Sequence, residues 1–238
     1  MRAAILAAGW GERLREGGVE TPKPLVRVAG RTLLHHALGA VREAGADRAL
    51  VVVNEGFADA VADALDALPP PLPVELVRRT TASSLETFAV ASAHLVDEPR
   101  ALVAMVDGIF PAGAARAFGQ AAHGLSEGEP ALEGLIGVTD RRDDDRPLRV
   151  AFDAARRISA IGRGAEASSW STAGLYLLPG RAFAAAGEAL EEGLGALRAY
   201  LERLVEMGVA LRAHPLGAVV DVDRPDDLQE AERAGEGA

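Results

Sequence analysis

The sequence contains no cysteine, and that absence alone excludes several kinds of site. Without thiols the chain forms no disulfide, binds no metal through thiolates and has no cysteine nucleophile. Any metal must be held mainly by oxygen atoms or by histidine. Long apolar runs are missing too. No segment approaches the roughly 18 to 20 residues that span a bilayer, and the opening MRAAILAAG shows no signal-type segment. These absences predict a cytoplasmic protein that does not enter a membrane.

Basic residues are in deficit, with 25 Lys and Arg against 35 Asp and Glu and a formal net charge of −10. Binding a phosphate backbone regardless of its sequence requires clustered Lys and Arg that displace counterions. We therefore expect no nucleic-acid surface, although a small anion in a local basic pocket remains open. The 238 residues, 49% of them hydrophobic, are enough to bury one sizeable core. We predict a single domain over residues 1–238.

The chain alternates between apolar runs of strand length and longer stretches with helical periodicity. This alternation is typical of an α/β protein with a parallel or mixed sheet and helices on both faces. The runs are AAILA, ALVVV, VELV, ALVAMV, GLIGV, AGLYLL and AVVDV.

Two helices can be predicted in more detail. Ser83 followed by Glu86 is the pattern of a capping box, and it predicts a helix start there. A second helix is expected between Gly30 and Gly45, with its apolar side formed by Leu33, Leu34, Leu38 and Val41.

Ligands of open α/β sheets bind beyond the carboxyl ends of the strands, so we examined the loops that follow the apolar runs. The first loop begins GWGERLREGG, and Gly9 and Gly11 would let backbone N–H groups wrap a triphosphate. It is neither a P-loop, which ends in Gly-Lys-Ser/Thr, nor a dinucleotide fingerprint, because Leu14 replaces the third glycine. A tight turn with a solvated Arg13 is the alternative. Lys23 favours a site, because the prolines on both sides of it would aim its ammonium in one direction.

Two further loops carry carboxylates. Asp107 ends the buried run ALVAMV at the predicted ligand edge, although an aspartate there also serves as a cap for the next turn. Asp221 and Asp223 lie two apart in AVVDVD, so along a strand both would face one side. The alternative is an edge strand followed by an acidic helix start, which is the interpretation we prefer for Asp226 and Asp227.

An anion-binding loop, two cations and separated carboxylates together indicate phosphoryl or nucleotidyl transfer. Oxygen ligands suit Mg²⁺, which uses one or two carboxylates plus substrate phosphates. An acceptor that is itself a phosphate monoester has a second pKa of about 6, so it is already ionised at neutral pH. Such a nucleophile needs no general base, and none is evident. Positioning and charge neutralisation would then carry the catalysis.

At this point the sequence resembles the sugar-phosphate nucleotidyltransferases. These include sugar-1-phosphate uridylyl- and thymidylyltransferases and the inositol-1-phosphate and phosphocholine cytidylyltransferases. The resemblance rests on LAAGWGERL followed by PKPLVRVAGRTLL, and it continues through TASSLETFAVA, MVDGIF, STAGLYLLP and VVDVDRPDDLQEAE, over about residues 2 to 234. It implies a Rossmann-like, mostly parallel mixed sheet of the nucleotide-diphospho-sugar transferase type. The implied reaction joins an NTP to a phosphorylated acceptor, with Mg²⁺ as cofactor and pyrophosphate as the second product.

The resemblance also assigns residues. It implies that Arg13 and Lys23 bind phosphates and act in catalysis, and that Asp107 is the first metal ligand. The second ligand is Asp223 or Asp221, and we favour Asp223. Nucleotide-binding positions by the same resemblance are Leu6, Ala7, Ala8, Gly9, Gly11, Thr81, Ser83 and Ser84. Acceptor-binding positions are Thr172 and Gly174.

Two residues depart from the family pattern. Gly108 follows Asp107 where several relatives place a further polar or acidic residue, and Glu12 stands where many have a small or hydroxylated one. These departures favour one alternative, a catalytically silent nucleotide-binding or regulatory subunit. A glycosyltransferase is the rival enzyme, but it typically has two acids close together after the central strand. An NAD-dependent oxidoreductase is the weakest alternative, because the third glycine is missing. Members of the family often form dimers, so a homodimer also remains open.

Overall fold

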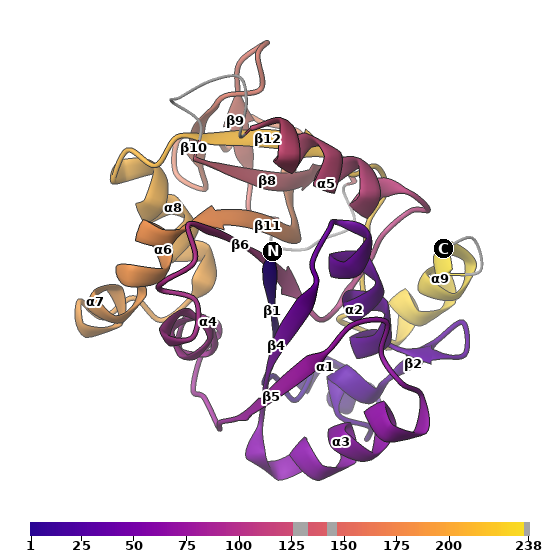
Figure 1. Ribbon diagram of the computed structural model, residues 1–238. Coiled ribbons are helices and arrows are strands. Elements are labelled where there is room, and N and C mark those ends of the chain that lie inside the picture. The colour runs from indigo at the N-terminus through magenta and orange to yellow at the C-terminus, as the bar shows by residue number, and fades with distance from the viewer. Residues whose placement is uncertain (126–132, 142–146, 236–238) are drawn as a thin grey trace.

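A computed structural model describes residues 1–125, 133–141 and 147–235. Within these residues a seven-stranded mixed sheet runs through the molecule in the order β12-β8-β11-β6-β1-β4-β5 (Figure 1). Neighbouring strands are parallel except for β11, which is antiparallel to both β6 and β8. The strands are β1 (Arg2–Ala7), β4 (Arg48–Val53), β5 (Val74–Arg78), β6 (Arg100–Met105), β8 (Gly134–Thr139), β11 (Ser171–Pro179) and β12 (Leu211–Pro215).

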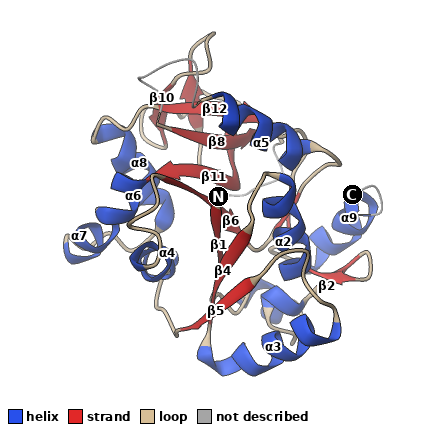
Figure 2. Cartoon of the chain, viewed as in Figure 1, coloured by secondary structure: helices blue, strands red, loops and turns tan. Residues whose placement is uncertain are grey.

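Helices cover both faces of this sheet, as the alternation of the sequence predicts (Figures 1 and 2). One apolar cluster joins one face of β1 to α1, α2, α3, α5 and α9, and a second joins the other face to α4, α6, α7 and α8. None of the described helices is long and apolar enough to cross a membrane. The helices are α1 (Glu12–Glu16), α2 (Leu33–Glu43), α3 (Ala58–Ala67), α4 (Ser84–Ala93), α5 (Ala114–Gly124), α6 (Gly180–Ala184), α7 (Ala186–Glu191), α8 (Leu197–Glu206) and α9 (Pro225–Gly235), with 3-10 turns η1 (Lys23–Leu25) and η2 (Glu55–Phe57).

Both helices predicted in detail are present. The four apolar residues expected on one side of α2 are fully buried, and the side chain of Thr32 caps its first turn by accepting from the His35 N–H. At α4, the Glu86 N–H donates to Ser83 Oγ at 3.1 Å, and Glu86 Oε2 accepts from the Ala82 N–H. The capping-box prediction is therefore confirmed, with the return bond made one residue earlier than the motif specifies.

Three short ladders stand outside the central sheet, and they correct two expectations. The run AVVDV does not form a strand of that sheet. Its β13 (Val220–Asp221) pairs antiparallel with β7 (Gly108–Ile109), directly after Asp107. The sheet instead takes in β12, which the apolar runs did not predict because its sequence LRAHP is half polar. The other two ladders are β2 (Arg27–Val28) with β3 (Arg31–Thr32), and β9 (Val150–Phe152) with β10 (Ile158–Ile161).

Candidate functional site

Loops that are far apart in the sequence meet around one cavity at the carboxyl ends of β1, β4 and β6. We call this hollow the nucleotide cavity. The predicted site residues that line it are Leu6, Ala8, Gly9, Gly11, Arg13, Lys23, Thr81, Ser83, Ser84, Asp107 and Asp223.

The prediction and the structure differ at a few positions around this cavity. Ala7 is fully buried in the apolar cluster of the opposite sheet face, because successive residues of a strand point to opposite sides. Trp10, Asn54 and Thr87 also line the cavity and were not predicted to do so. Asn54 directly follows the apolar strand β4, so the rule that identified Asp107 applies to it as well.

The glycine-rich loop has a conformation that requires glycine at one position. Gly11 has φ of 75°, in the left-handed region, and a Cβ placed there would lie 2.9 Å from the Cβ of Lys23. The backbone N–H of Lys23 also donates to the carbonyl of Trp10 at 3.4 Å. The loop and the Pro-Lys-Pro segment are thus packed directly against each other, and a side chain at residue 11 would separate them.

Trp10 fixes the other side of this loop. Its ring meets the ring of Phe57 edge to face, with centroids 5.0 Å apart at 87°, and the guanidinium of Arg15 lies 5.4 Å from the indole centroid. A Cβ on Gly56 would lie 2.9 Å from the indole, so this glycine makes room for the ring. The indole is nevertheless 37% exposed, and it contacts the nucleotide cavity.

Lys23 lies at the centre of the charged groups. Its Nζ donates to Asp107 Oδ2 at 2.6 Å and makes a second short bond to Asp223 Oδ1, while Arg13 donates to Asp223 Oδ2 at 3.2 Å. Lys23 is only 8% exposed, and it is the single lysine of the sequence. The prolines at 22 and 24 place it in the short turn η1. We call Arg13, Lys23, Asp107 and Asp223 the charged cluster.

The charges of the cluster stabilise one another. Burial by itself would lower the pKa of Lys23, but the carboxylates of Asp107 and Asp223 outweigh it and raise that pKa. Burial would raise the pKa of Asp223, and here Lys23 and Arg13 outweigh it and lower that pKa. At neutral pH the lysine is therefore an ammonium and Asp223 is a carboxylate.

The carboxylates of the cluster suit a hard cation. Asp107 and Asp223 both contact one ammonium, so their oxygens converge on a single position for a cation. Two carboxylates are what Mg²⁺ takes from a protein when nucleotide phosphates supply further ligands. The described residues contain no group of three or more His, Cys, Asp or Glu that could hold a metal. Metal binding at this position would therefore depend on the nucleotide.

The start of α4 forms the opposite wall of the nucleotide cavity. Thr81 Oγ1 and Thr87 Oγ1 are 2.7 Å apart, and Ser83 caps the helix. Ser84 Oγ accepts from the Leu197 N–H at 3.0 Å, which ties this wall to the start of α8. These hydroxyl groups have structural partners, so their role toward a nucleotide would add to a role in holding the loop.

A second cavity adjoins the first beyond Asp107 and Asp223, and we call it the acceptor-side cavity. Thr172, Gly174, Tyr176 and Asp221 line it. Gly174 has φ of 73° inside β11, and the register between β11 and β8 shifts between Thr172 and Tyr176. This irregularity is a bulge of the kind that redirects side chains next to functional sites.

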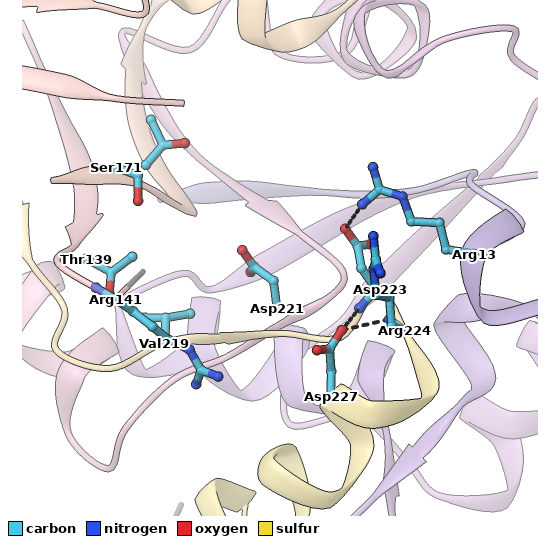
Figure 3. Close-up of a pocket in the computed structure, with 10 residues that line it drawn as sticks. Arg13, Thr139, Arg141, Ser171, Val219, Asp221, Asp223, Arg224 and Asp227 are labelled. Atoms are coloured by element: carbon cyan, nitrogen blue, oxygen red, sulfur yellow. Dashed lines mark hydrogen bonds and ion pairs between the residues drawn. The ribbon is translucent and has the colours of Figure 1, made fainter. Parts of the chain in front are cut away.

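Figure 3 shows a further hollow beside these residues, where Asp221 lies between Ser171 and Thr139 on one side and Asp223 on the other. Asp227, in the first turn of α9, accepts from the backbone N–H groups of Asp223 and Arg224 at 2.9 and 2.7 Å. The helix-start interpretation is therefore confirmed for Asp227, which holds the turn that carries Asp223.

The fold and the charged cluster define an α/β protein of the nucleotidyltransferase class. The chain belongs to the family of MobA-like NTP transferase domains, whose sequence profile matches residues 3–206. The predicted resemblance to nucleotidyltransferases is therefore confirmed at the level of the family.

Individual relatives agree with this assignment. The chain is 32% identical over 240 residues to the bifunctional IPC transferase and DIPP synthase of Rubrobacter xylanophilus, covering 97% of this chain and 51% of that protein. It is 48% identical over 65 residues to the bifunctional protein GlmU of Xanthobacter autotrophicus, covering 27% of this chain and 14% of that protein. The chain thus spans about half the length of the first relative and a small part of the second.

Two solved structures share the fold. The inositol-1-phosphate CTP transferase from T. maritima superposes with a TM-score of 0.80 at 21% identity, covering 100% of this chain and 97% of that one. A structure described as a putative glucose-1-phosphate thymidylyltransferase from Bacillus anthracis gives 0.81 at 20% identity, covering 98% and 94%. The predicted mixed, mostly parallel Rossmann-like sheet is confirmed.

Proposed function

We propose that this protein transfers a nucleotidyl group from an NTP to a phosphorylated polyol or a sugar-1-phosphate and releases pyrophosphate. The charged cluster at the end of the glycine-rich loop carries the proposal, because it brings two cations and two carboxylates to one edge of the sheet. Family membership supports it. The names of a relative and a structural neighbour that each match nearly the whole chain favour CTP and an inositol phosphate as the first substrates to test.

The chemistry requires one P–O bond to form and another to break. An ionised phosphate oxygen of the acceptor attacks the α-phosphorus of the NTP without a general base, since the monoester has a second pKa of about 6. The bond from the α-phosphorus to the bridging oxygen breaks, and pyrophosphate leaves with the electron pair. Arg13 and Lys23 would neutralise the charge that develops on the phosphates, in a site already arranged to do so.

Asp107 and Asp223 would hold Mg²⁺ together with oxygens of the triphosphate. When bound, the ion neutralises phosphate charge and helps to align the leaving group. Gly9 and Gly11 would bind the phosphates through backbone N–H groups, with Leu6, Ala8 and the start of α4 around the nucleoside.

Pyrophosphate release tests the proposal. Wild-type protein is assayed with Mg²⁺, with CTP, UTP, dTTP, GTP or ATP, and with inositol phosphate, sugar-1-phosphates or phosphocholine. Asp107→Asn removes the charge of one cluster carboxylate, and Asp226→Asn is the matched control on the exposed start of α9. We expect release that requires one NTP and one acceptor, that is lost in Asp107→Asn and that is retained in Asp226→Asn.

Other outcomes identify the rival functions. A nucleotide that binds without release for any acceptor would replace the proposal with a nucleotide-binding or regulatory subunit. Transfer of sugar from an NDP-sugar to a hydroxyl acceptor would replace it with a glycosyltransferase.

A further inference from the structure

The two aspartates of the C-terminal segment lie in different surroundings, although they are two residues apart. Asp223 contacts both Lys23 and Arg13. Asp221 pairs through its backbone with Gly108 in the β13–β7 ladder, and it is exposed. The Asp223 N–H donates to the Asp221 carbonyl at 3.2 Å, so the chain turns between them. The alternation expected for a strand is therefore broken at this point.

The cavities separate the two carboxylates in the same way. Asp107 and Asp223 line both the nucleotide cavity and the acceptor-side cavity. Asp221 lines the acceptor-side cavity and the adjoining hollow of Figure 3. The point at which Asp107 and Asp223 converge is marked by the Lys23 ammonium. Asp223 thus belongs to the cation position, whereas Asp221 belongs to the acceptor side.

Thr172 shares both of these hollows with Asp221. The bulge at Gly174 offsets Thr172 from the regular register of β11, and a Cβ on Gly174 would lie 3.3 Å from that of Met105. The bulge therefore depends on glycine and brings a hydroxyl to the same wall as the Asp221 carboxylate.

The chemistry of this wall selects a class of ligand. An ionised carboxylate only accepts hydrogen bonds, so its partner must supply donors, and a hydroxyl group both donates and accepts. A quaternary ammonium would instead need exposed aromatic faces. The aromatic residue among the described residues that line this cavity is Tyr176, and only 4% of it is exposed. Several hydroxyl groups on the ligand satisfy the wall better than a choline group does.

We propose that Asp221 determines acceptor specificity by accepting hydrogen bonds from the hydroxyl groups of a phosphorylated polyol, and that Asp223 alone of the pair serves the metal. This inference rests on the proposed function and deepens it.

Matched Asp→Asn variants at 221, 223 and the control position 226 test it. Mn²⁺ binding is followed by electron paramagnetic resonance on nucleotide-loaded protein, which needs no turnover. Inositol phosphate is titrated calorimetrically into the same complexes, and the KM values for acceptor and NTP are measured separately. Asp221→Asn should weaken acceptor binding about tenfold to a hundredfold, the usual loss for a hydrogen bond to a charged group. It should leave Mn²⁺ affinity and the NTP KM at the control values, whereas Asp223→Asn should lose Mn²⁺ affinity.

A deoxy analogue of the acceptor sharpens the result. The analogue that lacks the hydroxyl bound by Asp221 should lose affinity for the wild type but not for Asp221→Asn. Equal loss of Mn²⁺ binding in the 221 and 223 variants would overturn the inference, as would unchanged acceptor affinity or a wild type that binds no polyol phosphate. A wild type that binds Mn²⁺, nucleotide and polyol phosphate as expected but releases no pyrophosphate would refute the proposed function alone.

Discussion

The nucleotide side and the acceptor side of the site are built differently. On the nucleotide side, Lys23 is buried and bonded to two carboxylates, and Gly11 packs against it. On the acceptor side, Asp221 is exposed on a two-residue strand. The first arrangement holds its charges in place before any ligand arrives, which is the requirement for stabilising a transition state. The second can change its side chains at little cost in stability, since exposed substitutions usually have small effects.

The largest effect is expected when the centre of the nucleotide side is removed. Lys23→Met should lower kcat by about 10²- to 10³-fold, as is usual for the loss of one preorganised donor. Lys23→Arg is the matched variant, because it keeps the charge but not the geometry of a small ammonium between two carboxylates. Steady-state kinetics of both variants check this. Activity within a few fold of wild type in Lys23→Met would mean that the two sides do not differ as described.

A smaller effect is expected from the packing between the loop and Lys23. Gly11→Ala combines a left-handed φ with a contact of 2.9 Å, so it should destabilise the fold by about 1–3 kcal/mol and weaken NTP binding. Gly18→Ala is the control, since Gly18 has φ of 89° but no atom within 4 Å of the added Cβ. Urea unfolding and nucleotide titration should separate the two variants. Equal losses would assign the effect to backbone conformation alone.

The support under Trp10 should matter less again. Gly56→Ala places a Cβ 2.9 Å from the indole, and because that ring lies at the surface we expect a cost of about 1 kcal/mol, at the low end for overpacking. The chain has two tryptophans, so Trp170→Phe leaves Trp10 as the sole indole reporter. Its fluorescence should change on NTP binding, and Gly56→Ala should raise the NTP concentration needed. An unchanged titration would show that the loop does not depend on this support.

The smallest effect concerns pH. Folding lowers the pKa of Asp223 below its ordinary value of 3.8, because Lys23 and Arg13 outweigh the effect of burial. Its stabilisation is therefore complete above that value and is lost as the pH falls through the lowered pKa of the folded protein. The difference in unfolding free energy between wild type and Asp223→Asn should be constant at higher pH and should shrink below the ordinary carboxyl range. A difference that grows on acidification would contradict the assigned partners.

The sequence was informative where local rules apply. Apolar runs located six of the central strands, periodicity placed the buried side of α2, and the position of Asp107 after a buried strand brought it to the cavity. The turn that separates Asp221 from Asp223 could not be predicted, because it depends on Asp227 holding the backbone and on the pairing of β13 with β7. The half-polar β12 was missed for a related reason, since pairing with β8 decides its conformation. The single lysine was a signal available from composition alone.

The bond between Lys23 and Asp223 joins residues 200 positions apart. During synthesis, the glycine-rich loop and its lysine leave the ribosome long before their second carboxylate has been made. Only Asp107 can pair with Lys23 in that interval. The protein therefore gains a complete cation position only when the segment beyond β12 has folded back onto β7, and truncation anywhere before residue 223 should leave the nucleotide loop without the partner that joins both sides of the site.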